Sequence, residues 1–169
     1  MITKLLTRRK DLNFERSYAA PVDAVWDAWT QAERLREWWG PEKTSVPECE
    51  LDLRVGGRIY VVTEAGEGMG KYQGTRWPMD GTFSVIEERA RLAYDARSWT
   101  EGEEEGSTIH VNDLTLSPEG DGTTSIRLHV AITSIGPKAK MAAFGMKWGY
   151  KQQLDQLGEL LGAAEFSAD

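Results

Sequence analysis

The sequence contains almost no cysteine and little histidine, which excludes several kinds of site. Its 169 residues include one cysteine, Cys49, and two histidines, His110 and His129. One cysteine cannot close an intramolecular disulfide, and no Cys-x-x-Cys motif or Cys/His cluster indicates a structural zinc. We therefore expect no metal, no cofactor and a reducing, cytoplasmic compartment.

Positive charge and long apolar runs are also scarce. The formal net charge is −7 at pH 7 and the sequence pI is about 5.0, with basic residues dispersed among acidic ones. Such a distribution is a poor surface for nucleic acid. No run approaches the ~20 apolar residues of a membrane span, and residues 1–14 lack the apolar core of a signal peptide. We expect neither nucleic acid nor a membrane as a partner.

The spacing of the apolar residues predicts an α+β fold. The first elements are a strand and two short helices, at residues 12–18, 21–29 and 31–39. Thr30 and Glu33 have the spacing of a capping box for the second helix. Six further strands, separated by short turns, are predicted at residues 45–53, 56–64, 81–88, 91–99, 107–117 and 124–132. Such short connections favour an antiparallel sheet, and the last helix, 137–161, is the only element long enough to cover it.

Four segments together resemble a known family. They are RSYAAPVDAVWDAWTQAERLREWWGP, ELDLRVGGRI, GTFSVIEERARLAY and GYKQQLDQLGELL. Their order is similar to that in the homologues of the activator of the heat-shock-protein-90 ATPase, which belong to the START-like, or SRPBCC, superfamily. The resemblance covers residues 12–162, which we take as one domain between tails at 1–11 and 163–169.

The resemblance implies a helix-grip, or Bet v 1-like, fold. In this fold a curved antiparallel sheet wraps around a long C-terminal helix, and two short helices follow the first strand. The family implies an apolar cavity between sheet and helix that often takes a small hydrophobic ligand. The superfamily includes lipid carriers, hormone receptors, polyketide cyclases and co-chaperone domains, so the fold alone does not assign an activity.

Two features depart from the family pattern. The eukaryotic co-chaperone has a further N-terminal domain that contributes to chaperone binding, and these 169 residues leave no room for it. A chaperone partner is therefore a weaker expectation than the fold. In addition, the Gly-Trp pair usual in the last helix is Gly149-Tyr150 here, which places a phenol in the expected cavity.

Aromatic residues are the main candidates for lining the cavity. The two rings of Trp38 and Trp39 cannot share one face, so we expect one to fill the core and the other to border the cavity entrance. The candidate ligand-binding residues are Trp38, Trp39, Tyr60, Trp77, Trp99, His110, Met146 and Tyr150. Arg58 and Arg97 either form surface ion pairs, with Glu64 as one partner, or orient an acidic ligand group.

Strand alternation separates the two histidines. His129 alternates with Leu128 and Val130 and is expected on the solvent face, whereas His110 is expected on the cavity side. His110 is a weak catalytic candidate because the spacing reveals no nucleophile or carboxylate partner for it.

The last helix carries two apolar stripes. The residues expected to face the sheet are Met146, Tyr150, Leu154, Leu157 and Leu161. Met141, Phe144 and Trp148, with the small Gly145, form a second stripe on the other side. This stripe is either a contact with a partner, such as a second copy in a homodimer, or is covered by the short helices or a loop.

The sequence thus favours a domain that binds a small hydrophobic or aromatic molecule, without established catalysis. One alternative is a co-chaperone-like interaction module that uses an outer face. The other is a polyketide cyclase-like enzyme in which His110 or Tyr150 donates a proton.

Overall fold

The computed structural model describes residues 9–137, 139–162 and 166–168, and the side chains of these residues except 141, 142 and 166–168. Its elements are β1 (Lys10–Tyr18), α1 (Val22–Thr30), α2 (Ala32–Leu35), β2 (Thr44–Leu51), β3 (Arg58–Ala65), the 3₁₀ helix η1 (Glu67–Tyr72), β4 (Arg76–Glu87), β5 (Arg91–Ser98), η2 (Glu104–Gly106), β6 (Thr108–Pro118), β7 (Thr124–Ile135), α3 (Lys140–Leu161) and β8 (Phe166–Ala168).

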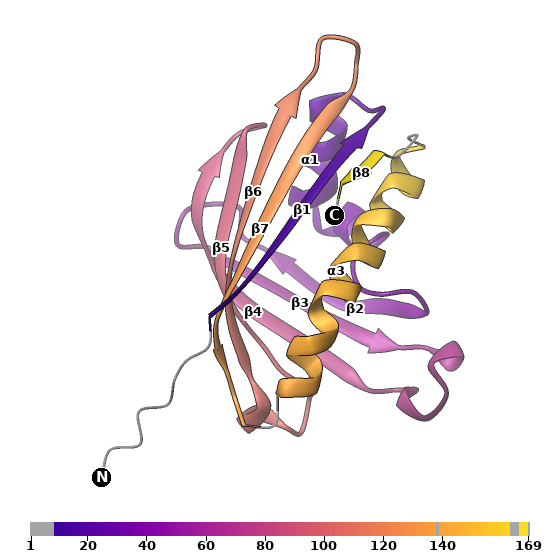
Figure 1. Ribbon diagram of the computed structural model, residues 1–169, viewed down its shortest axis with the longest axis vertical. Helices are drawn as coiled ribbons and strands as arrows, with labels where there is room; N and C mark the ends of the chain where they lie inside the picture. Colours follow the sequence, from indigo (N-terminus) through magenta and orange to yellow (C-terminus); the bar gives the residue numbers. More distant parts are fainter. Residues whose placement is uncertain (1–8, 138, 163–165, 169) are drawn as a thin grey trace.

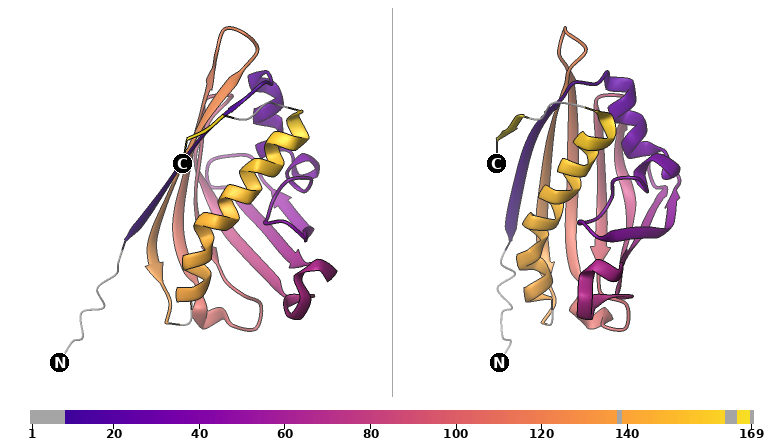
Figure 2. Two further views of the ribbon diagram at one scale, coloured as in Figure 1. Left: turned by 45° about the vertical axis from the view of Figure 1, so that its right-hand side comes forward. Right: turned by 90° about the vertical axis from the view of Figure 1, so that its right-hand side faces the viewer.

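The described strands form one antiparallel sheet that curves around α3. The strand order is β2-β3-β4-β5-β6-β7-β1-β8, so only β1 and β8 lie out of sequence order. Figure 1 and the two views of Figure 2 show α3 lying across the concave face, with α1 beside its C-terminal end. This arrangement confirms the predicted α+β class and the helix-grip fold.

The alternation in β1 explains how the sheet grips the helix. Leu12, Phe14 and Tyr18 are buried on the inner face, as expected for a strand with one face toward a core. Arg16 takes the remaining inner position and forms an ion pair with Asp155 of α3 (3.5 Å). The Tyr18 hydroxyl donates a hydrogen bond to the Leu154 carbonyl oxygen (2.9 Å). Strand and helix are therefore joined by polar contacts as well as apolar packing.

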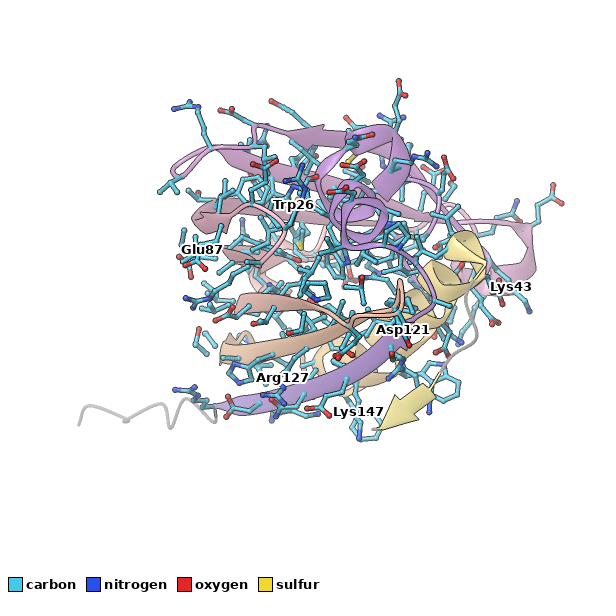
Figure 3. The ribbon with its side chains drawn as sticks, turned by 90° about the horizontal axis from the view of Figure 1, so that it is seen from above. Trp26, Lys43, Glu87, Asp121, Arg127 and Lys147 are labelled. Carbon is cyan, nitrogen blue, oxygen red and sulfur yellow. The ribbon has the colours of Figure 1, made fainter. Side chains whose placement is uncertain are left out.

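The outer face of the sheet is charged. In Figure 3, seen from above, the labelled side chains of Glu87 and Arg127 lie at the edge of the molecule. Arg127 forms an ion pair with Glu15 of the neighbouring strand (2.9 Å). His129 is on this face, as its alternation predicts, and contacts Asp11 (2.9 Å). The interior and exterior of the sheet thus differ sharply in polarity.

The second short helix differs from its prediction. Thr30 is the last residue of α1, and its hydroxyl donates to the Trp26 carbonyl oxygen (2.8 Å) instead of capping α2. The predicted capping box with Glu33 is wrong because α2 begins immediately after Gln31 and has no side-chain cap. The helix ends at Leu35, and turns carry the chain onward to Trp39.

Other boundaries also differ from their predictions. β4 begins at Arg76, before the predicted Gly81, because the strand tolerates Pro78, which pairs with Val62. α3 begins at Lys140 and not at Pro137, and it ends at Leu161 as predicted. Gly162, the residue after it, has a positive φ of 66°, which is usual just past a helix C-terminus. The sequence does not predict β8, which pairs with β1.

Candidate functional site

Three tryptophans pack together where α1 and the chain after α2 meet. The ring centroids of Trp29 and Trp38 are 4.6 Å apart, and those of Trp38 and Trp39 are 5.6 Å apart, both in edge-to-face geometry. Trp38 is 1% exposed, and its indole N–H donates to the Ala28 carbonyl oxygen (2.9 Å). Trp38 therefore belongs to the core, and Trp39 continues the cluster toward the sheet.

Glutamines of α3 hold the segment that follows Trp39. The Gly40 N–H donates to Oε1 of Gln153 (3.0 Å), and Nε2 of Gln156 donates to the Gly40 carbonyl oxygen (2.6 Å). Gly40 has a φ of +91°, and a Cβ there would lie 2.7 Å from Oγ1 of Thr44. Glycine is thus required for the turn that carries the chain from Trp39 to β2.

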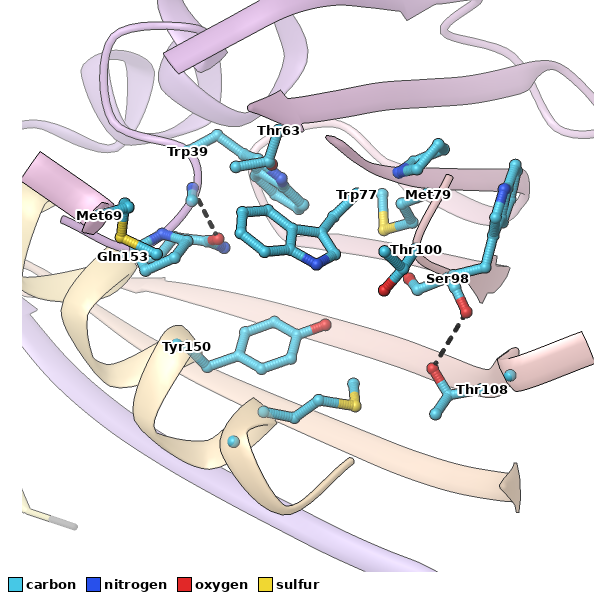
Figure 4. A pocket seen from close by; sticks show the side chains of 18 residues that line it. Trp39, Thr63, Met69, Trp77, Met79, Ser98, Thr100, Thr108, Tyr150 and Gln153 are labelled. Atoms are coloured by element: carbon cyan, nitrogen blue, oxygen red, sulfur yellow. Dashed lines mark hydrogen bonds between the residues drawn. The ribbon is translucent and has the colours of Figure 1, made fainter. Parts of the chain in front are cut away.

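A pocket of about 370 Å³ lies between this segment, the sheet and the first turns of α3 (Figure 4). Its lining residues come from the turn after Trp39, from β3 and η1, from the adjacent ends of β4, β5 and β6, and from α3. They are Trp39, Gly40, Pro41, Thr63, Met69, Trp77, Pro78, Met79, Ser98, Trp99, Thr100, Gly106, Thr108, Gly145, Met146, Gly149, Tyr150 and Gln153. The described lining thus combines three indole rings and a phenol with small and apolar residues, and it carries no charged side chain.

The pocket brings together five of the eight residues predicted to line a cavity. They are Trp39, Trp77, Trp99, Met146 and Tyr150. The prediction placed Trp38, Tyr60 and His110 there as well, but these three lie elsewhere: Trp38 is in the core, and Tyr60 lies under the guanidinium of Arg58, 4.2 Å from the ring centroid. Tyr60 alternates with the buried Ile59 and Val61 and therefore faces away from the interior.

The two arginines also lie outside the pocket lining. Arg58 pairs with Asp80 (2.9 Å) and with Glu50 (3.3 Å), and not with Glu64. Arg97 donates to the hydroxyl of Ser107 (2.8 Å), and its guanidinium lies 4.7 Å from the ring centroid of Trp99. Neither arginine is placed to orient an acidic group in the pocket.

A chain of hydrogen bonds runs from Tyr150 through the sheet to Ser98. The Tyr150 hydroxyl donates to Oδ1 of Asn112 (2.7 Å), and Nδ2 of Asn112 lies 2.8 Å from Nδ1 of His110. Nε2 of His110 then lies 2.8 Å from the Ser98 hydroxyl oxygen. Because Nδ2 can only donate, Nδ1 of His110 must accept, and Nε2 carries the proton toward Ser98. His110 thus positions Ser98 from behind the pocket wall.

This chain is better suited to fixing side chains than to moving protons. Burial lowers the pKa of His110 to about 4, so the imidazole is neutral near pH 7. Burial also raises the pKa of Tyr150 above its ordinary value. Both nitrogens of His110 are engaged, and its partners are neutral. The geometry therefore suits holding these side chains in place better than proton transfer by His110 or Tyr150.

Some residues of the pocket were not anticipated from the sequence. Gly145, Gly149 and Gln153 recur every four residues on α3, on the face toward the pocket. The prediction that placed Gly145 in the second stripe is therefore wrong, because this residue lines the pocket. That spacing was visible in the sequence, but small and polar residues between leucines give no apolar signal. Ser98 and Asn112 are joined to the site by contacts between strands, which a single sequence does not reveal.

The second stripe of α3 is exposed. Phe144 is 79% and Trp148 64% exposed, so within residues 9–137, 139–162 and 166–168 neither the short helices nor a loop covers them. The Lys10 ammonium lies 5.9 Å from the centroid of the Phe144 ring. The side chain of Met141, predicted to belong to the same stripe, lies outside the described residues.

Two further features of the described residues bear on function. No helix among them is both long and apolar enough to cross a membrane. Their His, Cys, Asp and Glu side chains form no group of three or more that could hold a metal ion.

Comparison with known proteins identifies relatives over most of the chain. A family model described as "Activator of Hsp90 ATPase homolog 1-like protein" matches residues 19–162. No curated protein matches the sequence. Protein NE0264 from Nitrosomonas europaea is a similar solved structure, with 26% identity, coverage of 90% of this chain and 94% of that chain, and a TM-score of 0.67.

Other solved structures share the fold at lower identity. Protein Ms6760 from Mycobacterium smegmatis is 21% identical, with 90% of each chain covered and a TM-score of 0.71. Protein CV1439 from Chromobacterium violaceum is 22% identical, with 89% of this chain and 96% of that chain covered and a TM-score of 0.69. These likenesses establish the fold and carry no information on the ligand.

Proposed function

Because the chain belongs to the family of Activator of Hsp90 ATPase homolog 1-like proteins, we propose that it binds a small apolar or aromatic molecule in the pocket between α3 and the sheet. Membership of this family supports either a ligand-binding domain or a protein-interaction domain. The fold alone does not distinguish these two functions, so the choice between them rests on the site. The proposal gives the ligand-binding role to this chain.

The observation that carries the proposal is an uncharged pocket bordered by aromatic rings. Its volume of about 370 Å³ falls within the range of roughly 300–1,000 Å³ typical of small-molecule sites. Trp39, Trp77 and Trp99 come from three different parts of the chain and border one space. Indole rings offer large flat apolar surfaces to a flat or aliphatic ligand.

Gly149 allows a test in which the pocket is filled without damage to the fold. A Cβ built at Gly149 meets no neighbouring atom within 4 Å, and the residue lines the pocket. We expect Gly149→Leu to occupy the ligand space and to weaken binding of an aromatic probe such as 2-acetylnaphthalene on the order of a hundredfold, about 2.7 kcal/mol. Isothermal titration calorimetry measures the dissociation constants of the wild type and the variant.

Gly149→Ala is the matched control because it removes the same glycine but leaves most of the space empty. In a helix interior this change raises the free energy of unfolding by about 1 kcal/mol. We expect it to change probe affinity far less than the leucine variant does. Equal affinity in the wild type and Gly149→Leu would place the ligand elsewhere and contradict the proposal.

A second candidate function is a protein contact through the exposed stripe of α3. It is supported by the exposure of Phe144 and Trp148, since large exposed apolar residues often mark interfaces. Such a contact could join two copies of this chain in a homodimer or join the chain to a chaperone.

A homodimer formed through this stripe predicts a change of mass in a double variant. In size-exclusion chromatography with light scattering, we expect the wild-type protein to elute as a dimer and the Phe144→Ser, Trp148→Ser variant as a monomer. An identical mass for the two proteins would contradict a homodimer formed through Phe144 and Trp148.

A further inference from the structure

One buried donor in the pocket has no partner within the described part of the chain. Gln153 is 5% exposed, and its Oε1 accepts the Gly40 N–H. This contact fixes the orientation of the amide, so Nε2 and its two hydrogens take the opposite position. Nε2 is buried and makes no hydrogen bond to a described residue. In Figure 4 the Gln153 amide is directed toward the space shared by Trp39, Trp77 and Tyr150.

An unpaired buried amide is costly, and here it lies at a site that can accept a ligand. A buried donor that forms no hydrogen bond destabilises the folded state by about 1–3 kcal/mol. Trp29 Nε1 and the Tyr94 hydroxyl are also buried without a partner among the described residues, but neither residue lines the pocket. Gln153 is thus an unsatisfied donor that a bound molecule can reach by entering the pocket.

The charge of the lining restricts the ligand further. No described lining residue is charged, and Arg58 and Arg97 are engaged on other surfaces. A carboxylate in this pocket would lose its hydration without a cation to compensate. The donor therefore suits a neutral acceptor, and the indole rings suit a flat apolar body.

Building on the proposed function, we propose that the ligand is a neutral aromatic carbonyl compound whose oxygen accepts a hydrogen bond from Nε2 of Gln153. Gln153 would then have two tasks: Oε1 holds the turn at Gly40, and Nε2 selects the ligand. The tryptophans contribute affinity for apolar rings in general, whereas the amide distinguishes a ketone or aldehyde from a hydrocarbon of the same shape.

Three probes of matching shape separate these contributions. They are 2-acetylnaphthalene, which has the carbonyl, 2-isopropenylnaphthalene, which has a C=CH₂ group in its place, and 2-naphthoate, which is anionic. We expect 2-naphthoate to bind the wild type on the order of a hundredfold more weakly than the ketone because its charge is buried unpaired. Calorimetric titration gives the three dissociation constants.

Two glutamine variants then assign the effect to the donor. Gln153→Leu should weaken binding of the ketone about tenfold, as expected for one lost hydrogen bond, and change that of the hydrocarbon less than twofold. Gln156→Leu is the matched control, because Gln156 also bonds Gly40 but does not line the pocket. Any loosening of the turn in this control should affect both probes equally.

A second measurement does not require a variant that folds. In ¹H–¹⁵N spectra of the wild type, one side-chain NH₂ proton signal of Gln153 should lie further downfield with the ketone bound than with the hydrocarbon bound. The naphthalene ring of either probe shifts nearby signals, but only the carbonyl accepts a hydrogen bond. If both naphthalenes bind but neither the spectra nor Gln153→Leu distinguishes them, the acceptor inference is overturned and the proposed function stands. If none of the three probes binds saturably, both are overturned.

Discussion

Replacing Trp38 by alanine is expected to lower the free energy of unfolding by about 3–5 kcal/mol, the range for a fully buried large aromatic residue. The ring is 1% exposed and packs edge-to-face on Trp29 and Trp39. Its loss leaves a cavity that the other two rings can fill only by moving. It also leaves the Ala28 carbonyl oxygen without the indole donor.

Urea unfolding followed by circular dichroism measures this effect. Trp148→Ala is the matched control, because it removes the same side chain from a position that is 64% exposed. Substitutions at such surface positions usually change stability by less than about 0.5 kcal/mol. Equal losses in the two variants would contradict the assignment of Trp38 to the core and of Trp148 to the surface.

Acid should destabilise the protein through His110 before most carboxylates titrate. Burial lowers the pKa of His110 from 6.5 to about 4, so the folded protein holds this residue neutral while the unfolded chain protonates it. The stability gained from the neutral form is fully present above pH 6.5 and is lost as the pH falls toward 4. The expected loss across this range is about 3 kcal/mol.

A His110→Gln variant isolates this contribution. Glutamine keeps a donor for Ser98 and an acceptor for Asn112 but does not titrate. Urea unfolding between pH 4 and 7 should therefore show a steeper decline in the wild type than in the variant. The carboxylates are common to both proteins, so they cancel in the comparison. Parallel curves for the two proteins would show that His110 is not held neutral by burial.

Much of the fold was predictable because its signals are local or belong to the family pattern. The alternation in β1 places Leu12, Phe14 and Tyr18 inside, and the spacing of Leu154 and Leu157 identifies the buried face of α3. Boundaries failed where a local rule competed with tertiary packing. Because proline is rare inside strands, Pro78 made the first half of β4 unrecognisable in the sequence. Thr30 has the residue type of a helix cap, but its hydroxyl donates a hydrogen bond to the Trp26 carbonyl oxygen within α1.

The candidate site was less predictable because its geometry depends on contacts between distant elements. The alternation of residues in β3 shows which residues share a face with Tyr60. It does not show which of the two faces meets α3. His110 is on the inner face, as expected, yet Ser98 stands between it and the pocket. The role of Gln153 depends on Gly40, 113 positions away in the chain. No local pattern encodes such a pairing.

The site also explains why two tryptophans occur in succession. Trp38 completes the core beside Trp29, and this fixes the backbone from which Trp39 extends to the pocket. The following Gly40 and Pro41 line the pocket, and Gly40 is bonded to two glutamines of α3. Core packing on one side of the chain thus positions a pocket-lining ring on the other.

The most direct test of ligand binding in the pocket is a titration of ¹⁵N-labelled protein with 2-acetylnaphthalene, followed through the indole N–H signals of its 7 tryptophans. The account predicts saturable shifts for Trp39, Trp77 and Trp99, which line the pocket, and none for Trp26 or Trp148. Shifts confined to Trp148, or unchanged signals for all three lining tryptophans at saturating probe, would contradict it.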